Sequence, residues 1–231
     1  MSEPTSKRRV ALIIPAYNEE QRIGKVLDAA VRCELADEIV VVCDGSTDHT
    51  ADVASLYAKV KVVDLQQNVG KAGAMAMGVA NCESELICFV DADLSGLRPE
   101  HIVKIVTPVI LGHCDMCTGI FRGGKFLSDS AQRVSPYLSG QRCCTREFFE
   151  SIPFLAEMRF GIDVTMNTLA RRQRLRVQRV VLHGLSNNLK ERKFGIVKGA
   201  TARAKMYAEI GRAMVRLRRK EAKRHAKKKI R

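Results

Sequence analysis

Two aspartates, Asp91 and Asp93, stand one residue apart directly after an apolar run from Leu86 to Val90. Such a run is typical of a buried strand in a parallel sheet that is covered on both faces. Alternate side chains of an extended segment point the same way, so we expect the two carboxylates to lie side by side. Close carboxylates repel each other unless water, a cationic side chain or a hard divalent cation separates them. The pair predicts a Mg²⁺ or Mn²⁺ site that bridges to a diphosphate; the alternative is that both side chains only cap a turn.

The elements that would position this pair alternate between strand and helix. Apolar segments predict strands at 9–17, 38–43, 60–65 and 86–90, with helices at 19–32, 49–58 and 72–81 between them. Within this pattern, Pro15 should end the first strand and Asn18 should cap the first helix. Short connections between alternating elements indicate an α/β fold, a mostly parallel sheet with helices on both faces. Polar clusters follow each strand, and ligands bind beyond the carboxyl ends of such strands, so the clusters should converge on one edge.

Length and composition limit the class of protein. The chain has 231 residues, 46% of them hydrophobic, which is enough for one domain with an appendage. No apolar run is long enough to span a bilayer and the N-terminus does not resemble a secretory signal, so we expect a cytoplasmic protein with reduced cysteines. The single CxxC, Cys114 to Cys117, is weak evidence for zinc without a second ligand pair.

The net charge of +14 lies entirely in residues 189–231, because residues 1–188 carry equal numbers of basic and acidic side chains. We therefore divide the chain into a domain at 1–188 and a basic extension at 189–231, in which Gly195 to Lys220 has the apolar spacing of an amphipathic helix. An inert solvated tail and an anchor to an anionic membrane surface both fit this composition. Nucleic acid is less favoured, because the segment has no nucleic-acid motif and no interleaved aromatic residues.

Four motifs in order resemble the signatures of glycosyltransferase family 2: IIPAYNEE at 13–20, CDGSTD at 43–48, NVGKAGAM at 68–75 and VDADL at 90–94. The resemblance implies the GT-A fold and a nucleotide-diphosphate sugar as the donor. Within the family the chain looks most similar to small soluble members related to dolichol-phosphate mannosyltransferase and to glucosyl-3-phosphoglycerate synthase. Cys43 stands where many relatives have an aspartate, which leaves the base of the donor open.

The resemblance also implies roles for individual residues. Asp44 resembles the aspartate that accepts from the base, Lys71 resembles a residue beside the base and phosphates, and Asp91 and Asp93 resemble the metal-binding DxD motif. The residues that resemble the lining of the base and ribose are Pro15, Ala16, Tyr17 and Glu19.

The second half of the chain supplies further candidates. A predicted strand at 115–124 ends near Arg122, and Arg142 precedes a short predicted helix at 146–151. The family resemblance implies that these arginines contact phosphates. The alternative is that both are ordinary surface arginines. Asp163 lies at the start of a predicted helix that precedes a strand at 175–182. Its position resembles that of an acidic residue which acts as a general base in the family. The alternative is that Asp163 only caps the N-terminus of the helix. His183, which ends that strand, resembles a third metal ligand; a structural role is the alternative.

These features predict a metal-dependent glycosyltransferase that moves a sugar to a phosphorylated acceptor, with polyprenyl phosphate at the inner face of a membrane as the favoured case. A small hydroxyl acceptor such as a phosphoglycerate is the alternative within the same class, and the His183 resemblance leaves a retaining reaction open beside an inverting one. A non-catalytic nucleotide-sugar-binding module is the alternative in another class. A nucleotidyltransferase fits less well, because PAYNEE stands where a glycine-rich phosphate loop would be needed.

Overall fold

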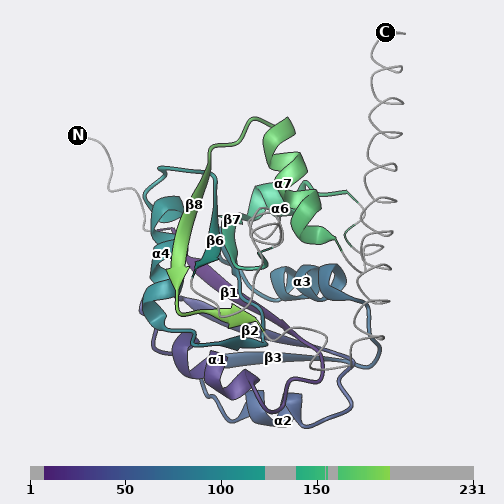
Figure 1. Ribbon diagram of the computed structural model, residues 1–231. Helices are drawn as coiled ribbons and strands as arrows, with labels where there is room; N and C mark the ends of the chain where they lie inside the picture. The colour runs from purple at the N-terminus through teal and green to yellow at the C-terminus, as the bar shows by residue number, and fades with distance from the viewer. Residues whose placement is uncertain (1–7, 123–138, 154, 156–160, 188–231) are drawn as a thin grey trace, which may run out of the picture.

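The computed structural model describes residues 8–122, 139–153, 155 and 161–187. Its centre is a seven-stranded sheet in the order β3-β2-β1-β4-β7-β6-β8 (Figure 1). Within this sheet β7 alone runs antiparallel to its neighbours, so the predicted mostly parallel α/β sheet is confirmed. The strands are β1 (Val10–Ala16), β2 (Glu38–Asp44), β3 (Val60–Leu65), β4 (Leu86–Phe89), β6 (Met116–Arg122), β7 (Arg142–Thr145) and β8 (Val177–His183).

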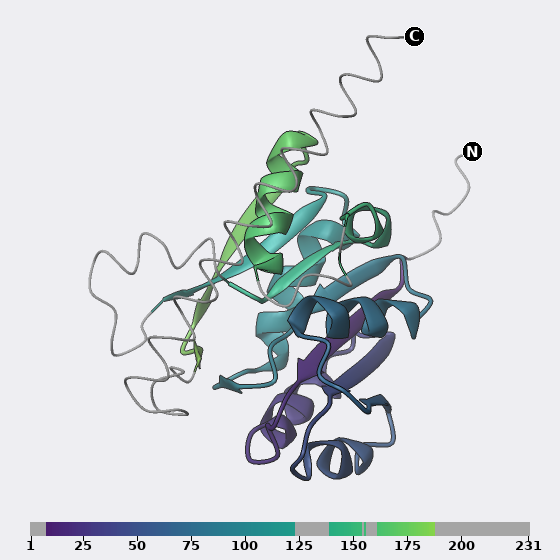
Figure 2. The same cartoon turned by 90° about the vertical axis from the view of Figure 1, so that its right-hand side faces the viewer.

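Helices cover both faces of the sheet (Figures 1 and 2). They are α1 (Ile23–Ala30), α2 (Thr50–Ser55), α3 (Lys71–Ala80), α4 (Pro99–Ile110), α6 (Arg146–Glu150) and α7 (Ile162–Arg172). Apolar side chains of α1, α2 and α4 pack on one face, and those of α3, α6 and α7 on the other. Side chains of β1 alternate between the two faces. Leu12 and Ile14 pack in the apolar core beneath α1, α2 and α4, and Ala11 and Ile13 pack in the core beneath α3, α6 and α7. A strand buried on both faces explains the continuous apolar run in the sequence.

The start of α1 differs from the prediction. Asn18 does not cap the helix: its backbone is left-handed, with φ of 53°, and its side-chain oxygen accepts from the Thr47 amide at 2.8 Å. The helix begins only at Ile23, and β1 continues through Pro15 to Ala16. Asparagine adopts the left-handed conformation more readily than most residues, and here the long-range bond of its side chain to Thr47 ties the end of β1 to the loop after β2.

The segment with the two aspartates is not extended. After β4, Ala92 and Asp93 form a turn that leads into β5 (Leu94–Ser95), which pairs antiparallel with β9 (Ser186–Asn187). Helix α4 and strands β5, β7 and β9 were not predicted from the sequence pattern. Strands of two residues such as β5 and β9 carry no periodicity that a sequence pattern could reveal.

All eight cysteines are buried free thiols, as expected for reduced side chains. Among the residues described, no helix is both long and apolar enough to cross a membrane. The basic extension predicted at 189–231, and its amphipathic helix, lie outside the described residues.

Candidate active site

The candidate site residues lie along one edge of the sheet, because six of its strands run in the same direction and β7 begins where they end. The residues at this edge are Tyr17 after β1, Asp44 at the end of β2, Asp91 after β4, Arg122 at the end of β6, Arg142 at the start of β7 and His183 at the end of β8. Lys71 opens α3 and Asp163 lies in the first turn of α7. The edge therefore gathers the predicted polar clusters, as the alternating pattern required.

The loops after β1 and β2 are joined by reciprocal hydrogen bonds. The Asn18 and Glu20 amides donate to Ser46 and Asp48, each at 3.2 Å, and the His49 amide donates to Glu20 at 3.0 Å. Glu19 is buried, and its carboxylate pairs with Arg22 at 3.0 Å. Tyr17, in contrast, is 44% exposed. Of the four residues predicted to line the base and ribose, Tyr17 thus offers the most open surface, and Glu19 holds the loop.

Asp44 fixes the segment that leads into α3. Its carboxylate accepts from the Val69 amide at 2.7 Å and the Gly70 amide at 2.9 Å, and its carbonyl accepts from the Asn68 side chain at 3.0 Å. The side chain is nearly buried. In this structure Asp44 positions the start of α3. Its hydrogen bond with the nucleotide base of the donor remains a prediction.

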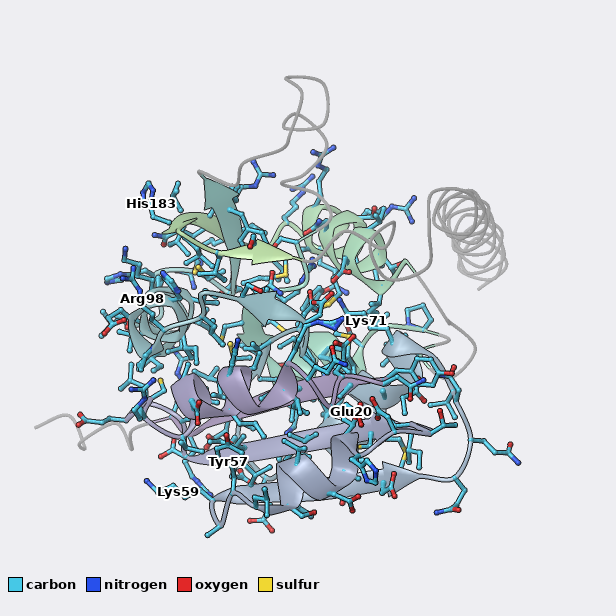
Figure 3. All side chains as sticks on the ribbon, turned by 60° about the horizontal axis from the view of Figure 1, so that its bottom comes forward. Glu20, Tyr57, Lys59, Lys71, Arg98 and His183 are labelled. Carbon is cyan, nitrogen blue, oxygen red and sulfur yellow. The ribbon has the colours of Figure 1, made fainter. Side chains whose placement is uncertain are left out.

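Lys71 lies between two carboxylates. Its Nζ is 2.7 Å from Asp91 Oδ1 and 3.3 Å from Asp163 Oδ2, and its side chain is 28% exposed. In Figure 3 its side chain lies within the molecule, whereas Lys59 and His183 lie at the margin. Burial alone would lower the pKa of Lys71, but the carboxylates of Asp163 and Asp91 raise the pKa above its ordinary value. Lys71 is therefore a fixed positive charge at the centre of the edge.

Asp91 has a partner on each oxygen. Oδ1 forms an ion pair with Lys71, and Oδ2 accepts a hydrogen bond from the side-chain amide (Nε2) of Gln141 at 2.7 Å. Burial opposes ionisation of Asp91, but Lys71 and Gln141 outweigh burial, so the pKa of Asp91 lies below its ordinary value. Gln141 was not predicted, because its contact depends on the antiparallel pairing of β7 with β4, and nothing in the sequence around residue 141 indicates that pairing.

Arg142 is completely buried and holds the start of α7. Its Nη2 lies 3.1 Å from Asp163 Oδ1 and donates to the Ser139 carbonyl, while Nη1 donates to the Asp163 carbonyl at 3.1 Å and to Asn167 at 3.4 Å. Although Asp163 Oδ1 lies close to Arg142, it has no hydrogen-bond partner of good geometry among the described residues. Arg142 thus fixes Asp163 from behind, and its predicted contact with a phosphate stays untested.

Arg122 and His183 lie on strands that are set apart from β4, the strand that leads to Asp91. Arg122 and His183 are register partners on β6 and β8, and three strand spacings of about 4.8 Å separate β8 from β4. Asp93 is half-buried in the turn before β5. The described part of the chain contains no group of three His, Cys, Asp or Glu side chains that could hold a metal, so Asp91, Asp93 and His183 do not form a three-ligand centre here.

Gly140 provides a test of this arrangement. A Cβ at this position would contact Asp91 Oδ2 and would lie 2.6 Å from both Asp91 Oδ1 and Lys71 Nζ. We expect Gly140→Ala to displace the ion pair and to lower the free energy of unfolding by about 1–3 kcal/mol, measured by urea denaturation. Gly24→Ala is the control, because its new Cβ would meet only ordinary contacts, 3.5 Å from the Tyr57 hydroxyl. Equal stability of the two variants would show that residue 140 does not pack tightly against Asp91.

Residues 11–168 match the model of the family described as Glycosyl transferase family 2. Among solved structures, glucosyl-3-phosphoglycerate synthase from Mycobacterium tuberculosis, in complex with Mn²⁺, UDP and phosphoglyceric acid, is similar with a TM-score of 0.68 and 25% identity. The match covers 88% of this chain and 79% of that one. Because the family match spans most of the sequence, the chain belongs to glycosyltransferase family 2, and the fold is the GT-A type expected from its motifs.

Two curated relatives match over shorter stretches. A dolichyl-phosphate beta-glucosyltransferase from Mus musculus is 37% identical over 101 residues, covering 37% of this chain and 31% of that protein. A 4,4'-diaponeurosporenoate glycosyltransferase from Staphylococcus aureus (strain USA300) is 36% identical over 104 residues, covering 43% of this chain and 28% of that protein. The chain thus spans about a third of the length of these curated relatives.

Proposed function

We propose that this protein transfers a sugar from a nucleotide-diphosphate sugar to a phosphorylated acceptor, with the help of a divalent cation. The observation that carries the proposal is the Lys71–Asp91 pair at the carboxyl edge of the sheet in a chain of family 2. Around this pair lie the loops whose motifs resemble a donor site. Tyr17 and the loops after β1 and β2 would hold the nucleoside, and Lys71 would face the diphosphate.

The site suits a cation that protein and substrate hold together. Mg²⁺ is usually bound by one or two carboxylates, with substrate phosphates and water completing the shell, so a three-residue cage is not needed. Asp93 would hold the cation together with Asp91, as the resemblance of the pair to the DxD motif implies. When bound, the cation would neutralise the nucleoside diphosphate as it leaves. Several structures of the mycobacterial synthase contain Mn²⁺ or Mg²⁺ together with UDP, which supports this assignment.

The surroundings of Asp163 favour a phosphate as the acceptor. A general base must come within hydrogen-bonding reach of the hydroxyl that it deprotonates. In the described part of the chain, Asp163 Oδ1 is buried beside Arg142 and Oδ2 faces Lys71 at 3.3 Å, so both oxygens are directed at cationic side chains. A phosphate monoester, with a second pKa of about 6, is already ionised near neutral pH and needs no such base. Asp163 would then position Lys71 and Arg142.

Two candidate acceptors contain a phosphate, but only a polyprenyl phosphate would accept the sugar on that phosphate, whereas a phosphoglycerate would accept it on a hydroxyl. The name of the murine relative refers to dolichyl phosphate, and the mycobacterial synthase was solved with phosphoglyceric acid. We favour a polyprenyl phosphate, because residues 189–231 carry the whole excess of positive charge. Basic side chains near an anionic membrane contribute about 1 kcal/mol each, which would concentrate the protein where a lipid acceptor lies.

A transfer assay tests the proposal. Labelled UDP- and GDP-sugars are incubated with the full chain, Mg²⁺ or Mn²⁺, and either polyprenyl phosphate in anionic vesicles or 3-phosphoglycerate, and the label is partitioned between organic and aqueous phases. We expect metal-dependent label in the organic phase. If label appeared only in a phosphoglycerate product, the proposed transferase activity would be supported and the proposed lipid acceptor would be wrong. Tight binding of a sugar nucleotide without transfer or hydrolysis would support a non-catalytic binding module instead.

A further inference from the structure

We propose that Lys71 acts as the internal counter-ion of Asp91, so that the free protein binds a divalent cation weakly and the cation enters together with the nucleotide. The inference rests on the proposed function, since it concerns the order in which that site fills. It begins from one contact: Lys71 Nζ lies 2.7 Å from Asp91 Oδ1, so the charge of Asp91 is already balanced by a cationic side chain.

The ammonium is held firmly in this place. Asp163 Oδ2 attracts it from the α7 side at 3.3 Å, and Arg142 in turn fixes Asp163. Gly140 leaves no space behind the pair, because even a methyl group there would contact both partners. The second oxygen of Asp91 is bound by Gln141 at 2.7 Å. Each oxygen of Asp91 thus keeps only one free acceptor site, and a cation bound there would lie close to the Lys71 ammonium.

Charge balance gives the same result. The two carboxylates of Asp91 and Asp163 are matched by the two cations Lys71 and Arg142, so these four side chains form a neutral group without any metal. A divalent cation placed beside Asp91 would be repelled by Lys71 at short range. A nucleoside diphosphate changes this balance, because its negative oxygens offer Lys71 a new partner and offer the cation new ligands. Nucleotide and cation should then strengthen each other's binding.

Binding of Mn²⁺ to the free protein, followed by electron paramagnetic resonance of unbound Mn²⁺, measures this directly. We expect Lys71→Met to bind Mn²⁺ at least about tenfold more tightly than wild type when no nucleotide is present. Lys71→Gln should behave likewise, and its amide can still donate to both carboxylates if Lys71→Met fails to fold. Lys59→Met is the matched control: it removes the same charge from an exposed site at the margin of the molecule, and its Mn²⁺ affinity should equal that of wild type (Figure 3).

Two results would overturn the inference. One is a folded Lys71→Met or Lys71→Gln protein that binds Mn²⁺ no more tightly than wild type. The other, which needs only wild type, is an affinity for Mn²⁺ that is the same with and without UDP or GDP. Either result leaves the proposed function intact as long as wild type still transfers sugar. Failure of wild type to bind any sugar nucleotide would instead count against the proposed function itself.

Discussion

Asp93→Asn is expected to lower kcat/KM for sugar transfer by at least about 100-fold, because it removes the carboxylate that would hold the cation against the departing diphosphate. The substitution preserves the size of the side chain, so the turn between β4 and β5 should remain. The measurement is steady-state transfer at saturating Mg²⁺, together with the thermal midpoint of unfolding as a check on folding.

Asp52→Asn is the control for this change. Asp52 lies in α2, and its side chain is 77% exposed and paired with His49 at the surface. The same loss of one negative charge, from an exposed side chain that is not a proposed ligand of the cation, should leave kcat/KM within about twofold, as expected for a screened surface charge. If Asp93→Asn retained activity similar to that of Asp52→Asn, Asp93 would have no part in the reaction.

Arg142→Met is expected to lower the free energy of unfolding by about 3–5 kcal/mol, because it leaves Asp163 without its buried partner. Arg142 has no exposed surface, and it also binds the Ser139 and Asp163 carbonyls, which would lose their donors. Equilibrium unfolding in urea measures the change. The double variant Arg142→Met, Asp163→Asn should recover a large part of it, since removing both charges of a buried pair is often nearly neutral.

Arg176→Met is the matched surface control. Arg176 forms an ion pair with Asp115 at 2.7 Å, but its side chain is 61% exposed. Exposed pairs contribute little, so the free energy of unfolding should change by less than about 1 kcal/mol. Similar effects of Arg142→Met and Arg176→Met would mean that Arg142 does not organise the start of α7.

The parallel part of the fold was predictable because its signals are local. Even β3, a partly exposed strand at the edge of the sheet, has turn residues at each end, and its predicted bounds, Val60–Leu65, agree with the structure. Antiparallel β7 was not predicted, because a four-residue strand acquires its partners only through contacts with distant segments. The start of α1 was predicted wrongly for a related reason. Asn18 is a good capping residue, but its long-range bond to Thr47 holds it in a left-handed conformation instead.

The candidate site was predictable as a set of loops but not as a set of contacts. The spacing of the motifs placed Lys71 and Asp91 at one edge, the family resemblance added Asp163, and the structure joins the three by ion pairs. The sequence could not reveal that Gln141 binds Asp91 or that Gly140 is needed beside it, because residues 140 and 141 lie far from Asp91 along the chain. Nor could it reveal that the width of the sheet separates His183 from Asp91.

Isothermal titration calorimetry measures whether this protein uses a nucleotide-diphosphate sugar together with a divalent cation. UDP- and GDP-linked sugars are titrated into the full wild-type chain with Mn²⁺, with Mg²⁺, or with EDTA. We expect one sugar nucleotide to bind, with an affinity at least about tenfold lower in EDTA than with the preferred cation. No binding of any sugar nucleotide under any of these conditions would contradict the account.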